Sequence, residues 1–272
     1  MNRHYLLKLL FIAVFAFFLI TSLGCDKQEP LNFAPYKVGI STYVFRNFPL
    51  PTAINKIKKL GVNNIEISTS HVEHTISDER KEELLALFED KAINVVSYGV
   101  VDFTNDTEEN RRIIKFVRDL GINLIIANPV KESVESLYEL AGEYGVGIAI
   151  QNGGPDSRWD TWEDIYEAWP YSVDYVGTCV NTGQYMRSRQ RPSTAIKNLQ
   201  YRVFSVHLTD FSSDTQESTI GGGELNVSSV LMALKEIGFP HYIIIDISID
   251  PDDPMPALKS SIGVLEALLQ SS

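Results

Sequence analysis

Cysteine and histidine are scarce in this sequence, with two cysteines and five histidines among 272 residues. Cys25 lies in an N-terminal leader, so Cys179 is the one cysteine left for the rest of the chain and no intrachain disulfide can form there. Cys179 lies in an apolar stretch, a setting typical of an inert core thiol. We therefore expect the fold to be held by its hydrophobic core.

An excess of basic charge is also missing. Lys and Arg number 24 against 35 Asp and Glu, which gives a formal net charge of −11. Binding to nucleic acid or to an anionic surface requires clustered Lys and Arg. This composition therefore argues against both kinds of partner.

A helix that spans a bilayer needs roughly 20 consecutive apolar residues. The N-terminal part of the sequence has no apolar run of that length. The uncharged apolar run 9–20 follows the basic residues Arg3 and Lys8, a pattern typical of a signal peptide. Small residues then precede Cys25, which resembles a bacterial lipoprotein cleavage site. We predict a signal peptide over 1–24, lipidation of Cys25 and a tether over 25–35. An uncleaved membrane anchor is the alternative, and both place the domain outside the cytoplasm, in the periplasm or cell envelope.

The rest of the chain repeats one pattern: an amphipathic helix, a break, and a short continuous apolar strand. Ile54 and Ile57 precede the segment 64–68, and Ile113, Phe116 and Val117 precede 123–127 at helical spacing. Strands without alternation are buried on both faces, as in parallel sheets. The predicted strands are 38–42, 64–68, 94–100, 123–127, 147–151, 176–180, 203–208 and 242–247, with a last helix over about 256–269.

Eight strand–helix units predict an α/β protein with a single (β/α)8 TIM barrel over 36–272. A doubly wound open sheet is the alternative. It usually has fewer and less regular units, and no Gly-x-Gly-x-x-Gly turn follows the first predicted strand.

Active sites of such barrels lie at the carboxyl ends of the strands. Glu66, His207 and Asp246 each interrupt an apolar strand, which is stronger evidence than a polar residue in a turn. We predict that these ends converge on one pocket. The polar residues at the strand ends are Ser41, Thr42, Glu66, Ser68, Ser97, Tyr98, Asn128, Gln151, Asn152, Asn181, His207 and Asp246.

These strand ends resemble those of the xylose isomerase-like TIM barrel family, the sugar-phosphate isomerases and epimerases, over nearly the whole segment from Tyr36 to Leu269. The resemblance implies a divalent metal held by an acid or histidine on strand five, an aspartate on strand six, a histidine on strand seven and a glutamate on strand eight. The matching motifs are NIEI at 64–67, VVSYGV at 95–100, IANP at 126–129, QNGGP at 151–155, NTGQ at 181–184, VHLTD at 206–210 and IIID at 243–246.

At the metal positions that the resemblance implies, this chain carries Gln151, Asn181, His207 and Asp246. Amide oxygens are neutral and hold a divalent ion less tightly than carboxylates do. A bound Mn, Mg, Zn or Co ion is therefore expected to be weak or absent. Glu66 or Asp210 could restore negative charge if its side chain turned inward.

The predicted catalytic residues are Glu66, His71, His207 and Asp246; the resemblance supports His71 and His207. Each also has a structural interpretation: His207 as a hydrogen-bonded core histidine, Asp246 as a loop cap, Glu66 as a partner of Arg46 and His71 as a solvated loop residue. The predicted substrate-binding residues are Tyr43, Asn128, Gln151, Asn152, Trp159 and Gln184, because amides bind hydroxyls and aromatic rings stack on sugars. Aromatics of this kind equally often pack the loops themselves.

The resulting functional prediction is a sugar isomerase or epimerase outside the cytoplasm that acts on a small carbohydrate by proton transfer. The alternative is a sugar-binding lipoprotein that keeps the barrel and has lost the chemistry, which the substituted ligands favour. A DNA-repair endonuclease of the same fold is a poor third, because five histidines cannot supply its multi-zinc cluster. No oligomeric partner is inferred.

Overall fold

The computed structural model describes residues 31–168, 174–212 and 216–270. The predicted signal peptide, Cys25 and the first part of the predicted tether lie outside these residues, so those predictions stand untested. Among the described helices, none combines the length and the apolar character that crossing a bilayer requires.

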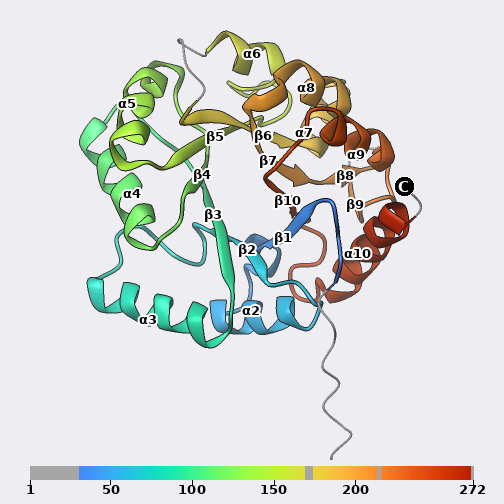
Figure 1. Cartoon of the computed structure of the whole chain (residues 1–272), viewed down its shortest axis with the longest axis horizontal. Coiled ribbons are helices and arrows are strands. Elements are labelled where there is room, and N and C mark those ends of the chain that lie inside the picture. Colours follow the sequence, from blue (N-terminus) through green and yellow to red (C-terminus); the bar gives the residue numbers. More distant parts are fainter. Residues whose placement is uncertain (1–30, 169–173, 213–215, 271–272) are drawn as a thin grey trace, which may run out of the picture. The chain divides into compact units, whose positions relative to one another are not determined.

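Eight parallel strands form a closed barrel in the order β1-β10-β7-β6-β5-β4-β3-β2 (Figure 1). Closure is made by β1, which pairs with β10 on one side and with β2 on the other. This confirms the barrel and excludes the open sheet. The strands of the barrel are β1 (Lys37–Ser41), β2 (Asn64–Ser68), β3 (Asn94–Val101), β4 (Leu124–Ala127), β5 (Gly147–Gln151), β6 (Val176–Asn181), β7 (Val203–Leu208) and β10 (Tyr242–Ile245).

Helices surround the barrel and cover its outer face (Figure 1). In α4, Asp106 accepts hydrogen bonds from two backbone N–H groups of the first turn, while Ile113, Ile114 and Val117 are buried. The α-helices are α2 (Leu50–Lys58), α3 (Asp78–Asp90), α4 (Thr107–Asp119), α5 (Val134–Tyr144), α6 (Trp162–Glu167), α7 (Thr182–Arg187), α8 (Pro192–Leu199), α9 (Val227–Glu236) and α10 (Met255–Gln270); the short 3-10 helices are η1 (Thr42–Phe45), η2 (Lys131–Ser133) and η3 (Gln200–Arg202).

Side chains at alternate strand positions fill the inner side of the barrel. Ile126, Ala149 and Cys179 form a buried inner cluster, separate from the main core between strands and helices. A Cβ atom added at Gly39 would lie 2.9 Å from the Ile244 side chain, so a larger residue there would require Ile244 to move. Cys179 is buried, as the sequence predicts. This filled interior forms the floor beneath the strand ends.

Three features differ from the sequence-based expectations. The last barrel strand ends at Ile245, so Asp246 follows the strand instead of lying inside it. Residues 31–35, expected in the tether, contact the barrel: Phe33 is 7% exposed, and the Leu31 N–H donates to the Gly61 carbonyl. A hairpin of β8 (Asp210–Phe211) and β9 (Glu217–Ser218) also extends the loop between β7 and α9.

Candidate active site

A cavity of about 300 Å³ opens at the carboxyl ends of the barrel strands. Its walls come from β1, β2, β3, β5, β6, β7, the segment after β10 and the β8–β9 hairpin. The cavity confirms that the strand ends converge on one pocket. Of the predicted site residues, it brings together Tyr43, Glu66, Gln151, Asn181, Gln184, His207 and Asp246.

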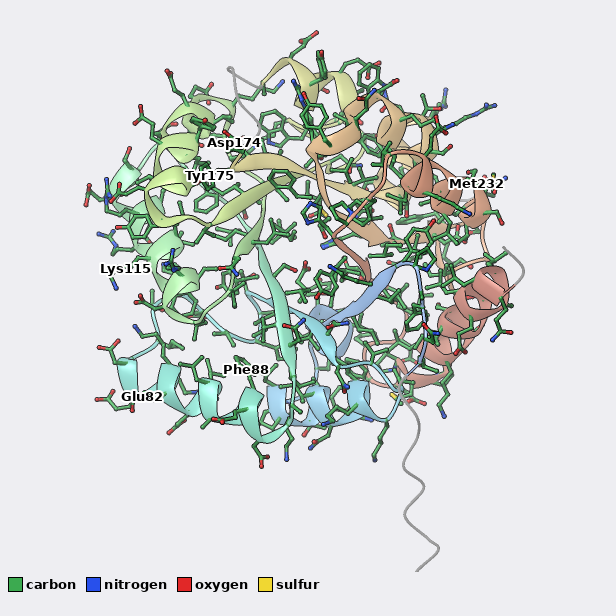
Figure 2. All side chains as sticks on the ribbon, in the orientation of Figure 1. Glu82, Phe88, Lys115, Asp174, Tyr175 and Met232 are labelled. Carbon is green, nitrogen blue, oxygen red and sulfur yellow. The ribbon has the colours of Figure 1, made fainter. Side chains whose placement is uncertain are left out.

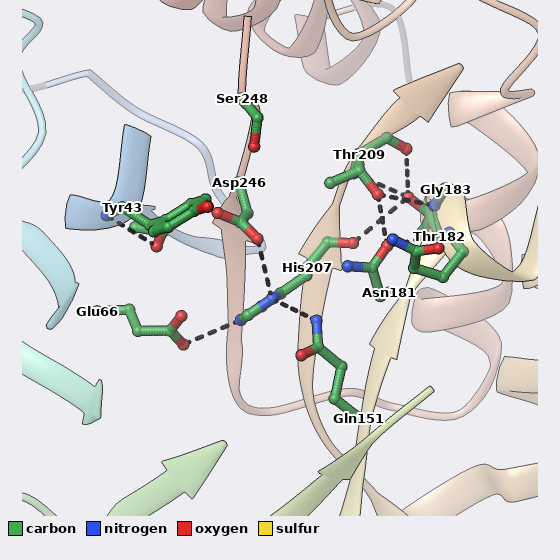
Figure 3. Close-up of polar contacts among 12 residues, drawn as sticks. Tyr43, Glu66, Gln151, Asn181, Thr182, Gly183, His207, Thr209, Asp246 and Ser248 are labelled. Carbon is green, nitrogen blue, oxygen red and sulfur yellow. Dashed lines mark hydrogen bonds and ion pairs between the residues drawn. The ribbon is translucent and has the colours of Figure 1, made fainter. Parts of the chain in front are cut away.

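His207 lies at the centre of this pocket and is bound at both ring nitrogens (Figure 3). Its Nε2 lies 3.0 Å from Oε2 of Glu66. Its Nδ1 lies 3.3 Å from Oδ2 of Asp246 and 3.0 Å from Nε2 of Gln151. The ring therefore links side chains from β2 and β5 and from the segment after β10.

Strand register brings these groups to one level. Glu66 pairs in register with Ser41 on one side and with Ser97 on the other, and His207 pairs with Asn181. Since side chains alternate between the two faces of a strand, Glu66 and His207 point into the barrel. Ser97 Oγ donates to Glu66 Oε2 at 2.7 Å. Glu66 is thus a buried carboxylate whose Oε2 is contacted by the Ser97 hydroxyl and by the His207 ring. It does not pair with Arg46.

The surroundings of His207 favour its protonated form. Burial alone lowers the pKa of the imidazole, but Cys179, Glu66 and Asp246 outweigh burial and raise that pKa well above its ordinary value. Burial also raises the pKa of the Cys179 thiol. The two carboxylates in contact with the ring are those of Glu66 and Asp246.

Asp246 is the member of this group that faces the cavity. Its side chain is 18% exposed, whereas His207 and Glu66 are almost fully buried. One oxygen, Oδ2, contacts His207, and the other, Oδ1, is a buried atom with no hydrogen-bond partner among the described residues. Buried acceptors are normally paired, so Oδ1 is an unsatisfied acceptor on a side chain that lines the cavity.

Glu217 is a pocket residue that sequence reasoning missed. The β8–β9 hairpin places it in the cavity wall, and its carboxylate accepts a hydrogen bond from the Ser248 backbone N–H. Burial, with a smaller contribution from the charge of Asp246, raises the pKa of Glu217. In the sequence Glu217 is one acid in a polar loop, and nothing in the local pattern distinguishes it from Glu224.

Two predicted pocket residues hold the strand ends together. Asn181 Oδ1 accepts hydrogen bonds from the Gln184 N–H and the Thr209 hydroxyl, so it begins α7 as an N-cap. Asn152 is buried, and its amide bonds both the N–H and the carbonyl of Asn181. Asn152 therefore joins β5 to β6 and does not line the cavity, which corrects its predicted role in substrate binding.

His71, Asn128 and Trp159 also lie outside the cavity lining, which corrects three further predictions. The His71 ring lies between the Thr42 hydroxyl and the Phe48 carbonyl. Asn128 donates to Asp102 at 2.6 Å. Trp159 is fully buried, and its Nε1–H donates to the Pro129 carbonyl at 2.8 Å, because this loop aromatic packs the loop itself.

Tyr43 and Gln184 lie in the cavity wall, as the sequence predicts. Tyr43 is 40% exposed, and the Arg46 guanidinium lies 4.7 Å from its ring centroid. Arg46 also donates to the Ser248 carbonyl at 3.3 Å. The loop after β1 is thereby joined to the segment after β10 at the rim.

Asp210 does not turn into the pocket. It is buried and accepts hydrogen bonds from the backbone N–H groups of Gly221, Gly223 and Leu225, at 2.9 to 3.1 Å. The glycine run 221–223 is thus a turn organised by a carboxylate, because the N–H groups of Gly221 and Gly223 both point at Asp210. Of the two acids that could restore negative charge to the pocket, Glu66 and Asp210, only Glu66 turns into it.

The donors present do not fit a divalent metal. Nε2 of His207 contacts Glu66, Nδ1 contacts the Gln151 amide and Asp246, and the oxygen of Asn181 accepts two hydrogen bonds. The described residues contain no group of three or more His, Cys, Asp or Glu side chains arranged to hold an ion. Metal ligation needs a deprotonated imidazole nitrogen that points at the ion.

With the fold and pocket described, comparison with known proteins becomes informative. The curated inosose isomerase of Bacillus velezensis is 23% identical over 235 residues, which cover 74% of this chain and 84% of that protein. The crystal structure of a D-tagatose 3-epimerase-like protein has a TM-score of 0.71 at 21% identity, covering 86% of this chain and 97% of its own. The 3-keto-D-glucoside 4-epimerase of E. coli has a TM-score of 0.70 at 17% identity, with 85% and 99% covered.

The sequence model of one family, described as "Xylose isomerase-like TIM barrel", matches residues 54–268. That range runs from α2 into α10 and includes seven of the eight barrel strands. The fold agrees with the match, since the barrel closes with eight parallel strands. The chain belongs to the xylose isomerase-like TIM barrel family.

Proposed function

We propose that this protein is a sugar isomerase or epimerase that moves a proton at a carbon beside the carbonyl of a small, unphosphorylated carbohydrate. The observation that carries the proposal is the acid pair at the cavity: Asp246 with a free, buried Oδ1, and Glu217 with a raised pKa across the rim. Related proteins named as isomerases or epimerases of inosose and of tagatose support the same class.

Asp246 is the group that takes the proton from carbon. His207 fixes the Asp246 carboxylate through Oδ2, and Glu66 holds the far side of the ring, so the Asp246 side chain is held in the cavity wall beside the ligand. His71, predicted as a second acid–base group, is held away from the cavity. Glu217 takes that role instead, because burial raises its pKa and so favours the protonated carboxyl group that can give a proton to the carbonyl oxygen.

The charge of the pocket favours a neutral ligand. Its described lining contains three carboxyl groups, those of Glu66, Glu217 and Asp246, against one imidazole and no Lys or Arg. Carboxylates accept hydrogen bonds from sugar hydroxyls, but they repel a phosphate. A sugar without a phosphate group is therefore the expected substrate.

A sugar-binding protein without turnover is the second candidate function. The observation that favours it is the pair of neutral amides, Gln151 and Asn181, at positions where the family resemblance implies charged ligands. Such a protein would hold the sugar in the same pocket and leave its C–H bonds intact.

Hydrogen exchange in D₂O separates the two functions. The full chain is incubated with an inosose, D-fructose, D-tagatose and D-psicose, and deuterium on carbon is followed by NMR. We expect solvent deuterium to appear beside the carbonyl of at least one sugar, with Asp246→Asn abolishing exchange while sugar binding persists. Met232→Gln is the matched control, because Met232 is 64% exposed on α9 and points away from the barrel (Figure 2). Binding without exchange in the unaltered protein would establish the second function.

We also propose that the domain is held at a membrane in the cell envelope by lipid on Cys25. The support comes from the sequence: a basic start, a twelve-residue apolar run at 9–20, and small residues before the cysteine. Membrane contact would then be made by the lipid, since the apolar run is removed with the signal peptide.

A further inference from the structure

We propose that a second cavity, at the amino ends of the barrel strands, binds a neutral carbohydrate. This amino-end cavity has a volume of about 530 Å³, within the range of about 300–1,000 Å³ that is typical of ligand pockets. Its walls come from the first residues of β3, β4, β5 and β10, from the segment before β6, and from β7. Of the described residues, none lines both this cavity and the active site, so the two are separate.

Phe204 closes the barrel between the two cavities. Its ring packs over Gly177 and Gly147, where an added Cβ atom would lie 2.6 Å and 3.8 Å from ring atoms. Glycine at these two positions therefore makes room for the ring inside the barrel. Together with Leu124, Phe204 packs against the buried inner cluster of β4, β5 and β6. The part of the ring that remains exposed lines the amino-end cavity.

Three further rings line the amino-end cavity, those of Tyr175, His241 and Tyr242. Tyr175 is 36% exposed, and a Cβ atom added at Gly142 of α5 would lie 3.5 Å from its ring (Figure 2). The ring centroid of His241 lies 5.8 Å from that of Phe204. Rings that line a cavity favour a ligand with an apolar face, such as the C–H face of a sugar.

Polar atoms at the same cavity are left without partners in the described part of the chain. The Tyr242 hydroxyl accepts a hydrogen bond from Asn94 Nδ2 at 3.1 Å, and its own hydrogen has no acceptor there. The ring nitrogens of His241 and the side-chain amide of Asn123 also have no hydrogen-bond partner among these residues. An apolar ligand would leave these groups unpaired, whereas sugar hydroxyls can pair with them.

The charge around the amino-end cavity favours a neutral ligand. In the described lining, Asp174 is the one residue with a charged side chain. Burial and the charge of Lys37 lower the pKa of His241, so its ring is neutral near neutral pH and has one donor and one acceptor nitrogen. An anionic ligand would therefore meet a carboxylate and no cation in the lining. This argument does not depend on the proposed catalytic activity, because none of these groups lines the active site.

Chemical-shift mapping of the ¹⁵N-labelled full chain tests the proposal, with D-glucose, maltose and phenol as separate probes. We expect both sugars to cause saturable shifts of the backbone amides at 94–96, 123–124 and 241–242. Sugar-induced shifts that never saturate at these amides, or that are confined to the active site, would overturn the proposal. Saturable binding of phenol there without binding of either sugar would overturn the ligand class. The amides at the two ends report separately, so failure of the catalytic proposal and failure of this one are distinguishable.

Two variants test the rings. Tyr175→Ala and His241→Ala should each weaken sugar binding at the amino-end cavity by roughly tenfold, because a stacking face is lost. Tyr201→Ala is the matched control, since Tyr201 is 64% exposed, precedes β7 at the same end of the barrel and lies outside the cavity lining. Binding by both variants as tight as that of the control would overturn the proposal. The titration of the unaltered protein stands even if a variant does not fold.

Discussion

At the scale of single residues, Glu66 and His207 form a buried contact at the centre of the barrel. Their side chains are 1% and 0% exposed, and Oε2 and Nε2 are 3.0 Å apart. Removing one partner of a buried pair leaves the other charge uncompensated, which costs more than removing both. The pair therefore behaves as a unit.

We expect His207→Gln to lower the free energy of unfolding by roughly 3–5 kcal/mol, the usual cost of breaking a buried pair. The double variant Glu66→Gln, His207→Gln should recover part of that loss, because no buried charge remains. Urea unfolding of both variants and of Glu66→Gln completes a double-mutant cycle. Additive effects would show that the two side chains do not interact.

Glu217 supplies a prediction about pH. Because its pKa is raised in the folded protein, the folded state keeps a proton that the unfolded chain releases above about pH 4.3. Stability due to this group is therefore present below that pH and is lost as the pH rises towards the folded pKa. Glu217→Gln removes the effect, so its unfolding free energy relative to the unaltered protein should improve between pH 4 and pH 7. A constant difference across this range would show that the pKa of Glu217 is not raised.

At the scale of elements, the loop from β7 to α9 depends on Asp210. Three backbone N–H groups converge on its carboxylate. We expect Asp210→Ala to lower the free energy of unfolding by roughly 3 kcal/mol or more, since each unsatisfied buried donor costs about 1–3 kcal/mol. The same change should weaken sugar binding, because the loop carries Glu217. Chemical denaturation measures the free energy of unfolding, and calorimetry measures sugar binding. Asp253→Ala, at an exposed position, is the control. A loss of stability and of binding no larger than the control's would contradict the role of Asp210.

Sequence patterns predicted individual strands and helices better than they predicted the site. Five-residue apolar runs such as 64–68 and 147–151 became β2 and β5 with the predicted bounds. Helix spacing was equally informative, since Ile113 and Val117 are buried on α4. The β8–β9 hairpin was not predicted, because strands of two residues are too short to show a periodic pattern of apolar residues.

At the scale of the whole molecule, the barrel is expected to be held at a membrane through Cys25. Cys25→Ser should move the protein from the membrane fraction to the soluble fraction of cell extracts, because lipid can no longer be attached. Membrane fractionation with immunodetection measures this, and Cys179→Ser is the matched control, since Cys179 is buried in the barrel. Retention of Cys25→Ser in the membrane would instead support an uncleaved anchor.

The sequence by itself determined the barrel, because eight repeated helix–strand units are encoded locally in apolar spacing, and it identified Glu66, His207 and Asp246 as a group. Only the tertiary structure decided which polar strand ends share the cavity. Asn152 and Trp159 have side chains suited to a sugar, yet they are used in joining β5 to β6 and in packing a loop. The direction of a side chain past the end of a strand depends on contacts from distant segments. Local pattern does not contain those contacts, and Glu217, carried in by a hairpin, was for that reason found only in the fold.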